Sequence, residues 1–421
     1  MNKKLKFLPF SFHPFLFAIF PAVAIFSENL NLLLPNDIIF PIFLFLGFAA
    51  GVWGLLRLIF KDYVKTSLVT SLTMFLFFSY GHLSSMLYDL IFKETTYKEH
   101  LVLLIVFLFI LIIVGRFILK TKRSLNKATA ITSVIAISLF IFPLVTIGSY
   151  YFEHDYAINE NDNVNTNFST DIGNLGQLPD IYFIILDSYT DNNTLKDIFN
   201  FDNSEFLSYL SEKGFFVSQK SFSNYNSSPL SIPSMLNMKY INYLTDEVGA
   251  DSSNRYLLYK MIDDNRAMQI VKSKGYVTVN LDSGWEATQY ISAADFNLCG
   301  KNQLLNSQVI VMMIRNSMLN PIYVKIFESD YRDRILCTFD KISDIHHEID
   351  SPVFVFSHIM LPHGPYYWGS NGEYITPDKA TLEGFRKDKE GFTDQLQFTN
   401  KKVKEMIDKI LTESDIPPVI V

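Results

Sequence analysis

Residues 179–189, PDIYFIILDSY, begin the segment 179–238, around which the rest of the chain is organised. Within it, residues 181–186 form a continuous apolar run with β-branched and aromatic side chains, and this run ends at Asp187. Such a run predicts a strand buried on both faces, as in a parallel sheet. Ligands of open parallel sheets bind beyond the carboxyl ends of the strands. We therefore expect Asp187 at a ligand-binding edge, with a simple turn after the strand as the plainer alternative.

A serine–proline pair follows in the same segment, within residues 226–236, NSSPLSIPSML. Serine is a preferred helix N-cap and proline is favoured at the first helical position, so Ser228 and Pro229 predict the start of a helix. A hydroxyl group at that position faces the positive end of the helix dipole, which suits a bound phosphate. Ser228 is therefore either a plain N-cap or a phosphate-site residue, and the residues themselves leave both interpretations open.

The composition points to a membrane protein. The chain has 421 residues, of which 49% are hydrophobic and 38 are Phe, and the apolar excess lies in the first 152 residues. The net charge is −7, and no basic block lies outside the membrane loops, so we expect no nucleic-acid partner. The only cysteines, Cys299 and Cys337, form no C-x-x-C metal motif, and the sequence leaves open whether they pair in an oxidising compartment.

Five apolar stretches are each long enough to cross about 30 Å of hydrocarbon as a helix. They are residues 7–27, 37–60, 66–92, 100–119 and 129–151. The positively charged residues gather before the first stretch and in the second and fourth connections, at Lys3, Lys4, Lys6, Arg57, Lys61, Lys65, Arg116, Lys120, Lys122, Arg123 and Lys127. Because cytoplasmic loops carry the excess of Lys and Arg, we expect a multi-pass protein of the cell membrane. Its N-terminus would be cytoplasmic and its C-terminal domain extracytoplasmic.

Three regions are predicted along the chain. Residues 1–151 form the transmembrane region, and the Asn- and Asp-rich residues 152–178 form a linker. Residues 179–421 form an α/β domain with a mostly parallel sheet and helices on both faces, because apolar strands alternate with helical patterns. The expected strands are 181–186, 215–217, 276–281, 353–357 and 418–421, and the expected helices are 206–213, 229–238, 254–274, 309–319, 332–349 and 391–411.

Two histidines add to the possible chemistry of this domain. His358 follows the predicted strand 353–357, and His363 lies in the constrained loop LPHGPYYW, residues 361–368. A surface turn is the alternative interpretation of this loop. Together with Asp187 and Ser228, these groups favour a metal-activated nucleophile site. A divalent ion would lower the pKa of the serine hydroxyl, and the helix N-terminus would stabilise phosphoryl oxygens.

Three motifs in this order, behind five predicted spans, resemble one protein family. DIYFIILDSY (180–189), FSNYNSSPLSIPSMLNM (222–238) and FSHIMLPHGPYYW (356–368) are similar to the sulfatase-like branch of the alkaline phosphatase superfamily. The resemblance is to its membrane-anchored members of the bacterial inner membrane, the lipoteichoic acid synthase and phosphoethanolamine transferase families. It implies an alkaline phosphatase-like α/β fold for residues 179–421.

The resemblance also implies roles for individual residues. Asp187 matches the first metal-ligating carboxylate. Ser228 matches the nucleophile that is also a metal ligand, usually Thr in the family, with Ser227 as the alternative in a register shifted by one residue. His363 matches the substrate-site histidine of the family's His-Gly-Pro motif, and His358 is a second substrate-binding candidate. The implied cofactor is a divalent metal ion, zinc or manganese.

One family motif is missing. The remaining metal ligands of the family lie in an Asp-His-Gly motif after a strand that resembles residues 417–421, and Asp-His-Gly occurs nowhere in the 421 residues. We therefore expect a domain truncated before that motif and an incomplete form of the fold. Asp187 and Ser228 alone give two protein ligands, whereas zinc takes about four.

The function that the resemblance implies is transfer of a phospho-alcohol group, of the phosphoglycerol or phosphoethanolamine type. The donor would be a phospholipid and the acceptor a cell-envelope glycan or lipid. Soluble sulfatases instead use a cysteine in C-x-P-x-R, which is absent here. The alternatives are a phosphoric or sulfuric ester hydrolase of the same fold, or a truncated membrane protein without catalytic activity.

Overall fold

The computed structural model describes residues 11–33, 35–87, 97–153, 178–218, 220–249, 252, 255–300, 308–375 and 388–421. The chain divides into two compact units, which we describe separately. The first contains residues 1–160 and 302–327, and the second contains residues 161–301 and 328–421. Residues 302–327 thus group with the first unit, although the sequence placed them in the predicted domain 179–421.

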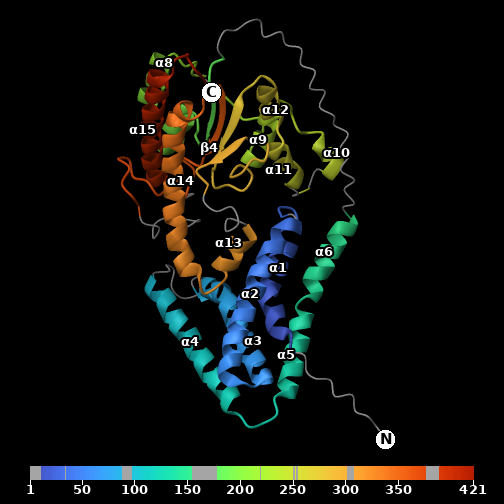
Figure 1. The fold of residues 1–421 in the computed structure, drawn as a ribbon. Coiled ribbons are helices and arrows are strands. Elements are labelled where there is room, and N and C mark those ends of the chain that lie inside the picture. The colour runs from blue at the N-terminus through green and yellow to red at the C-terminus, as the bar shows by residue number, and fades with distance from the viewer. Residues whose placement is uncertain are drawn as a thin grey trace. The chain divides into compact units, whose positions relative to one another are not determined.

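The first unit is helical (Figure 1). Three of its helical segments are long and apolar enough to cross a membrane, namely Pro35–Phe60, His100–Lys120 and Asn126–Phe152. The predicted first span corresponds to a helix of only 16 residues, and the predicted third span corresponds to Tyr63–Leu87, which is not among these three segments. A membrane protein with several apolar helices is therefore supported, and the number of five spans stays a prediction. The helices are α1 (His13–Glu28), α2 (Pro35–Phe60), α3 (Tyr63–Leu87), α4 (Tyr97–Lys120), α5 (Asn126–Ser138), α6 (Ile141–Glu153) and α13 (Gln308–Arg315).

Helix α13 belongs to this unit because its apolar side chains enter the helical core. Val309 and Met313 are fully buried in one cluster with residues of α1, α2 and α3. The Gly81 amide of α3 donates a hydrogen bond to the Asn316 carbonyl, and a Cβ at Gly81 would collide with the backbone there. Glycine at this position therefore permits the close approach of the segment that follows α13.

The second unit is an α/β domain with a five-stranded parallel sheet (Figure 1). The strand order is β3-β2-β4-β1-β5. This confirms the predicted α/β class with a parallel sheet, and the finer assignment to an alkaline phosphatase-like fold is taken up below as a proposal. The strands are β1 (Ile181–Leu186), β2 (Val277–Leu281), β3 (Phe296–Leu298), β4 (Val353–Ile359) and β5 (Val419–Ile420). The helices are α7 (Asn192–Phe199), α8 (Ser204–Glu212), α9 (Ser228–Leu236), α10 (Leu244–Val248), α11 (Tyr256–Asp263), α12 (Arg266–Ser273), α14 (Asn320–Glu348) and α15 (Lys389–Glu413). Of α14, residues 328–348 belong to this unit.

Both faces of the sheet are covered by apolar side chains. Val353 and Val355 of β4 belong to a core with α8, α14 and α15, whereas Phe354 and Phe356 belong to a core with α9, α11 and α12. Successive side chains of a strand point to opposite faces, so β4 contributes alternately to the two cores. This explains why the central strands appear as continuous apolar runs in the sequence.

Two of the predicted elements are wrong. Residues 215–218, which the structure describes, form no strand. The single helix predicted over 254–274 is divided into α11 and α12, because the side chain of Asn265 caps the second helix by accepting a hydrogen bond from the Met268 amide. Strand β3 was not predicted, since its three residues are too few to give a periodic signal.

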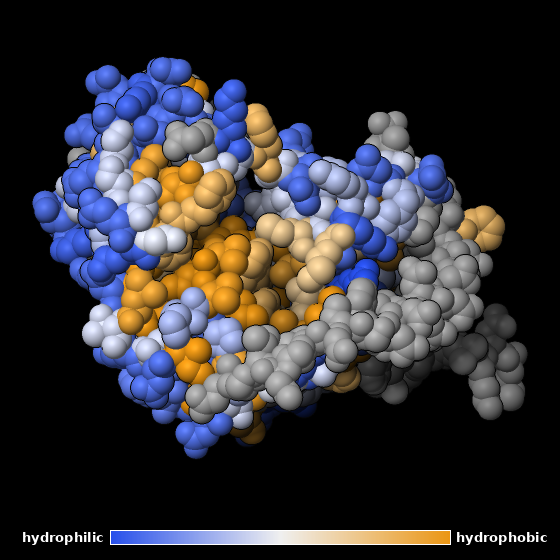
Figure 2. All heavy atoms as spheres, turned by 90° about the horizontal axis from the view of Figure 1, so that it is seen from above, coloured by the Kyte–Doolittle hydropathy of each residue, from blue (hydrophilic) through white to orange (hydrophobic). Residues whose placement is uncertain are grey.

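Some apolar side chains of the second unit are exposed. Phe216 is 94% exposed and Phe222 is 91% exposed. Figure 2 shows hydrophobic and hydrophilic side chains on the molecular surface.

Candidate functional site

Asp187 lies immediately after β1, as the sequence predicts. Its amide donates a hydrogen bond to the Ile359 carbonyl at the end of the neighbouring strand β4, at 2.9 Å. The next residue, Ser188, has a φ of 65°, so the chain turns sharply here. The carboxylate is thereby held at the carboxyl-terminal edge of the sheet, where its side chain is 15% exposed.

Ser228 is brought to this carboxylate from a segment 41 residues later. Its hydroxyl donates a hydrogen bond to Asp187 Oδ1 at 3.1 Å. Of the two adjacent serines, Ser227 has the extended backbone of an N-cap, with φ −150° and ψ 148°, and its side chain makes no capping hydrogen bond. Ser228 is the first residue of α9 rather than its N-cap, so the predicted helix start was wrong by one residue. Its hydroxyl group is consequently free to face Asp187.

His358 lies inside β4. The sequence had predicted it just after the strand, so that prediction was wrong. The apolar pattern of residues 353–356 gives way to Ser357 and His358, yet the strand continues to Ile359 because it pairs with β1, with Ile185 opposite His358. The imidazole is only 1% exposed. Its Nδ1 lies 2.9 Å from Thr288 Oγ1, and that hydroxyl is itself 2.7 Å from Ser283 Oγ.

The other ring nitrogen of His358 is directed at Asp187. Nε2 lies 3.8 Å from Asp187 Oδ1, which is too long for a hydrogen bond, and no described atom accepts or donates one there. A buried polar atom without a partner is rare in folded proteins. Ligand atoms of a tetrahedral zinc ion at about 2.0 Å from the metal are roughly 3.3 Å apart. The contacts of Asp187 Oδ1 with Ser228, at 3.1 Å, and with His358, at 3.8 Å, lie on either side of that value.

His363 contacts Asp187 through its backbone. Its amide donates a hydrogen bond to the Asp187 carbonyl at 3.1 Å, and its Nδ1 lies 2.5 Å from the Gly364 carbonyl. Both proline bonds beside it, Leu361–Pro362 and Gly364–Pro365, are cis. The backbone hydrogen bond from His363 places this loop beside Asp187.

The electrostatics of Asp187 follow from these neighbours. Burial raises the pKa of its carboxyl group, but the imidazole of His358, the charge of His363 and the hydroxyl of Ser228 together outweigh burial. The net result is a pKa below the ordinary value, so Asp187 is ionised at neutral pH. An ionised carboxylate is the form that accepts the serine proton and that ligates a metal ion.

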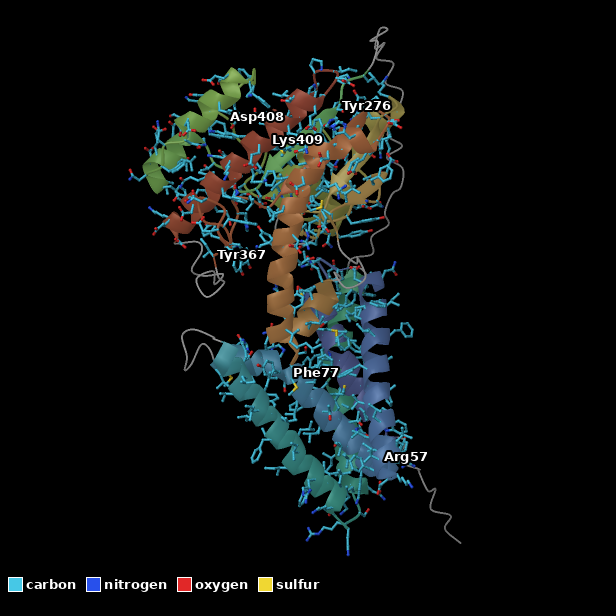
Figure 3. The ribbon with its side chains drawn as sticks, turned by 60° about the vertical axis from the view of Figure 1, so that its left-hand side comes forward. Arg57, Phe77, Tyr276, Tyr367, Asp408 and Lys409 are labelled. Carbon is cyan, nitrogen blue, oxygen red and sulfur yellow. A yellow bond between two sulfur atoms is a disulfide. The ribbon has the colours of Figure 1, made fainter. Side chains whose placement is uncertain are left out.

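Two positioning residues escaped the sequence interpretation. Thr288 fixes the orientation of His358, as described above. Gln395 of α15 is fully buried and donates hydrogen bonds to the Pro362 and His363 carbonyls, at 3.2 and 2.8 Å, while it accepts one from the Tyr367 amide. Tyr367 is labelled in Figure 3. These contacts link residues about 30 or more positions apart, and no local pattern reveals them.

A second buried carboxylate lies at the end of β2. Asp282 is 5% exposed, its Oδ1 accepts a hydrogen bond from the Gly284 amide, and Arg334 of α14 lies 3.6 Å away. Burial raises the pKa of Asp282, and the charge of Arg334 opposes that effect only in part. Asp282 follows a buried strand directly, as Asp187 does. The same sequence pattern could therefore have predicted Asp282 as a candidate site residue.

Comparison with known proteins adds no relative. No protein-family model matches the sequence, and no curated protein or solved structure is significantly similar to it. The resemblance to the sulfatase-like branch therefore stays a prediction from the three sequence motifs.

Proposed function

We propose that the chain is a membrane-anchored, metal-dependent phospho-alcohol transferase of the sulfatase-like type, with an alkaline phosphatase-like fold in its second unit. The observation that carries the proposal is the Ser228–Asp187 hydrogen bond at the first turn of α9, with the unpartnered Nε2 of His358 directed at the same carboxylate oxygen. A hydroxyl, a carboxylate and an imidazole at a helix N-terminus suit nucleophilic attack on a phosphodiester.

In the proposed reaction, Ser228 Oγ attacks the phosphorus of a phospholipid headgroup. Asp187 accepts the proton from the hydroxyl, and the bond between phosphorus and the diacylglycerol oxygen breaks. Diacylglycerol leaves with that proton, and the phospho-alcohol remains esterified to Ser228. A hydroxyl of the envelope acceptor then attacks the same phosphorus, and the bond between phosphorus and Ser228 Oγ breaks. The proton of the acceptor hydroxyl passes through Asp187 to Ser228 Oγ, which restores the serine.

Asp187, Ser228 and His358 are the residues that would hold the divalent ion, zinc or manganese. Such an ion would supply charge stabilisation for the attacking and phosphoryl oxygens. This extends the ligand set implied by the resemblance, which contained only Asp187 and Ser228, and it gives His358 a ligand role in place of a substrate-binding one. His363, held beside Asp187 by its backbone and by Gln395, remains the proposed substrate-binding residue.

The proposed location is the outer side of a cell membrane. Cys299 and Cys337 form a disulfide that joins the segment after β3 to α14, and structural disulfides persist mainly in oxidising compartments. This agrees with the predicted topology, in which the Lys- and Arg-rich connections face the cytoplasm. An outward-facing domain has the phospholipid donor and the envelope acceptor on its own side.

The adjacent serines offer a matched test. The full-length protein is placed in vesicles that contain phosphatidylglycerol or phosphatidylethanolamine, with Zn²⁺ or Mn²⁺, and diacylglycerol release is measured. We expect Ser228→Ala to abolish release and Ser227→Ala to retain it. Mass spectrometry of the wild-type protein is expected to find the phospho-alcohol on the peptide that contains Ser228.

The outcomes separate the related proposals. Diacylglycerol release by Ser228→Ala at the wild-type rate would refute the nucleophile assignment. Release without any transfer to an added glycan or lipid acceptor would identify a hydrolase. No release by the metal-loaded wild-type protein from either lipid would reject the transferase proposal.

A further inference from the structure

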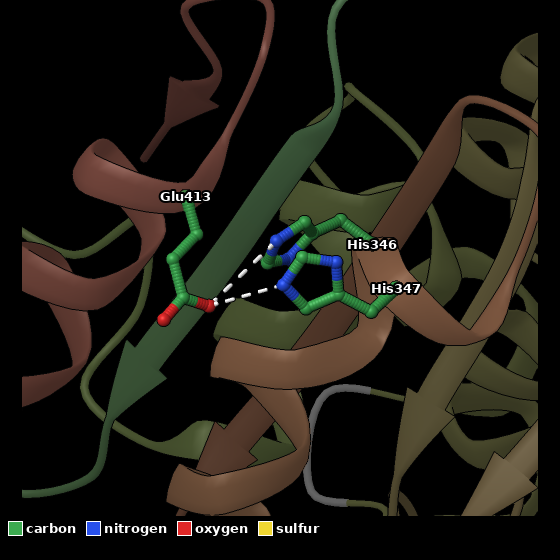
Figure 4. A group of neighbouring side chains, drawn as sticks. All are labelled: His346, His347 and Glu413. Carbon is green, nitrogen blue, oxygen red and sulfur yellow. Dashed lines mark hydrogen bonds and ion pairs between the residues drawn. The ribbon is translucent and has the colours of Figure 1, made fainter.

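Two histidines and a glutamate gather away from the Asp187 site. His346 and His347 lie in the last turn of α14, and Glu413 is the last residue of α15. One ligand atom from each of the three residues lies within 4.8 Å of the other two. Figure 4 shows both imidazole rings facing the Glu413 carboxylate.

The distances are close to those of a metal centre. Glu413 Oε2 lies 3.2 Å from His347 Nε2 and 3.9 Å from His346 Nε2. Three ligands of a tetrahedral zinc ion are roughly 3.3 Å apart, so the first distance already fits and the second requires a small contraction. Glu413 is 35% exposed at a helix end, where its side chain can adjust. His347 is 59% exposed, which leaves space for a water molecule as fourth ligand.

A second observation, independent of these distances, is that the side chain of His346 is buried without a hydrogen-bond partner among the described residues. Its side chain is only 8% exposed, and neither ring nitrogen has a hydrogen-bond partner among the described residues. Buried polar atoms without partners are rare and costly in folded proteins. A cation bound between His346 and Glu413 would satisfy the nitrogen that faces the carboxylate.

The charges nearby are balanced. Asp344 of α14 forms an ion pair with Lys409 of α15, which is labelled in Figure 3. Lys341 pairs with Glu348 at 2.5 Å. The charges of Asp344 and Lys409 thus offset each other, and Glu413 is the carboxylate that faces both imidazoles.

We propose that His346, His347 and Glu413 form a binding site for a divalent transition metal ion, and that this ion is zinc. Two imidazole nitrogens and one carboxylate oxygen suit zinc and related ions rather than Mg²⁺ or Ca²⁺, which prefer oxygen ligands. The bound ion joins the ends of α14 and α15, two helices that cover the same face of the sheet.

This site is distinct from the Asp187 site. In a parallel sheet, the helices that precede β4 and β5 end at the amino-terminal edge of the strands, whereas Asp187 follows the carboxyl end of β1. The six residues of β1 separate the two edges by about 20 Å. The role of the ion is therefore to stabilise the contact between two helices, and it does not act on the substrate of the Asp187 site.

The test counts zinc in a protein that lacks the other candidate site. Full-length protein with Asp187→Asn and Ser228→Ala is stripped with a chelator, dialysed against ZnCl₂ and analysed for bound metal. We expect one zinc per chain. Adding His347→Ala is expected to remove it, and adding Glu413→Gln to weaken binding by about 100-fold or more, since even outer residues of metal sites change affinity 10–100-fold. Glu405→Gln, which removes an exposed carboxylate on the same helix, is expected to change nothing.

Thermal unfolding supplies the second measurement. Saturating zinc is expected to raise the unfolding midpoint by about 5 °C in the protein that retains all three ligands, because the ion binds only the folded state. His347→Ala is expected to have the same midpoint without zinc and no rise with it, which shows that the variant is folded. Absence of zinc from the Asp187→Asn, Ser228→Ala protein, or retention of zinc after His347→Ala, would overturn the proposal.

Discussion

The two edges of the parallel sheet both carry histidine and carboxylate, but they hold them differently. At the carboxyl-terminal edge, His358 is fixed by Thr288, Asp187 accepts a hydrogen bond from Ser228, and the His363 loop is anchored by Gln395. At the amino-terminal edge, Glu413 and His347 are partly exposed and held mainly by each other. The groups at the carboxyl-terminal edge are thus positioned in advance, whereas those at the amino-terminal edge can close around an ion.

This difference has a chemical meaning. Catalysis needs reacting groups in place before the substrate arrives, because reorganisation during the reaction raises the barrier. A structural metal site has no such need, since the energy of metal binding can order its ligands. We therefore expect substitutions at the carboxyl-terminal edge to affect turnover, and substitutions at the amino-terminal edge to affect metal affinity and stability.

The largest expected effect is that of Asp187→Asn. The amide cannot accept the proton of Ser228 as a carboxylate does, and it is a poor metal ligand, so turnover should fall on the order of 10³-fold or more. The measurement is diacylglycerol release from vesicles by the full-length protein. Zinc bound by His346, His347 and Glu413 should be unchanged in the same variant, and loss of that zinc would show that the two edges are not independent.

The second-largest effect is expected for Thr288, which orients the imidazole of His358. Thr288→Val removes the hydroxyl that lies 2.9 Å from His358 Nδ1 and leaves a side chain of nearly the same shape. Loss of such an outer contact should weaken metal binding at Asp187 by about 10–100-fold and reduce turnover at limiting metal. Thr288→Ser should restore both.

Excess metal distinguishes the positioning role from a merely structural one. If His358 binds the ion, saturating Zn²⁺ or Mn²⁺ should recover most of the turnover of Thr288→Val. A loss of turnover that no metal concentration recovers would contradict the ligand role of His358.

The sequence predicted the parts of this site that depend on local pattern. The run 181–186 ends where β1 ends, so the position of Asp187 followed directly from hydrophobicity. The extent of β4 did not, because Ser357 and His358 interrupt the apolar pattern and only pairing with β1 continues the strand. Thr288 and Gln395 are fixed by contacts between distant segments, and His346 and His347 lie in a helix whose pattern gives no sign of Glu413.

The smallest expected effect tests the charges around the second site. Asp344→Asn removes a negative charge near both imidazoles and leaves Lys409 without its ion partner, so zinc affinity should fall about two- to threefold, the size expected for partly exposed charges. Lys409→Gln removes the opposing charge, and zinc affinity should rise by a similar factor. In the double variant the two changes should nearly cancel, and high salt should reduce each of them. A fall in affinity in both single variants would instead indicate that the Asp344–Lys409 pair holds α14 and α15 together, and the electrostatic account of the site would then be wrong.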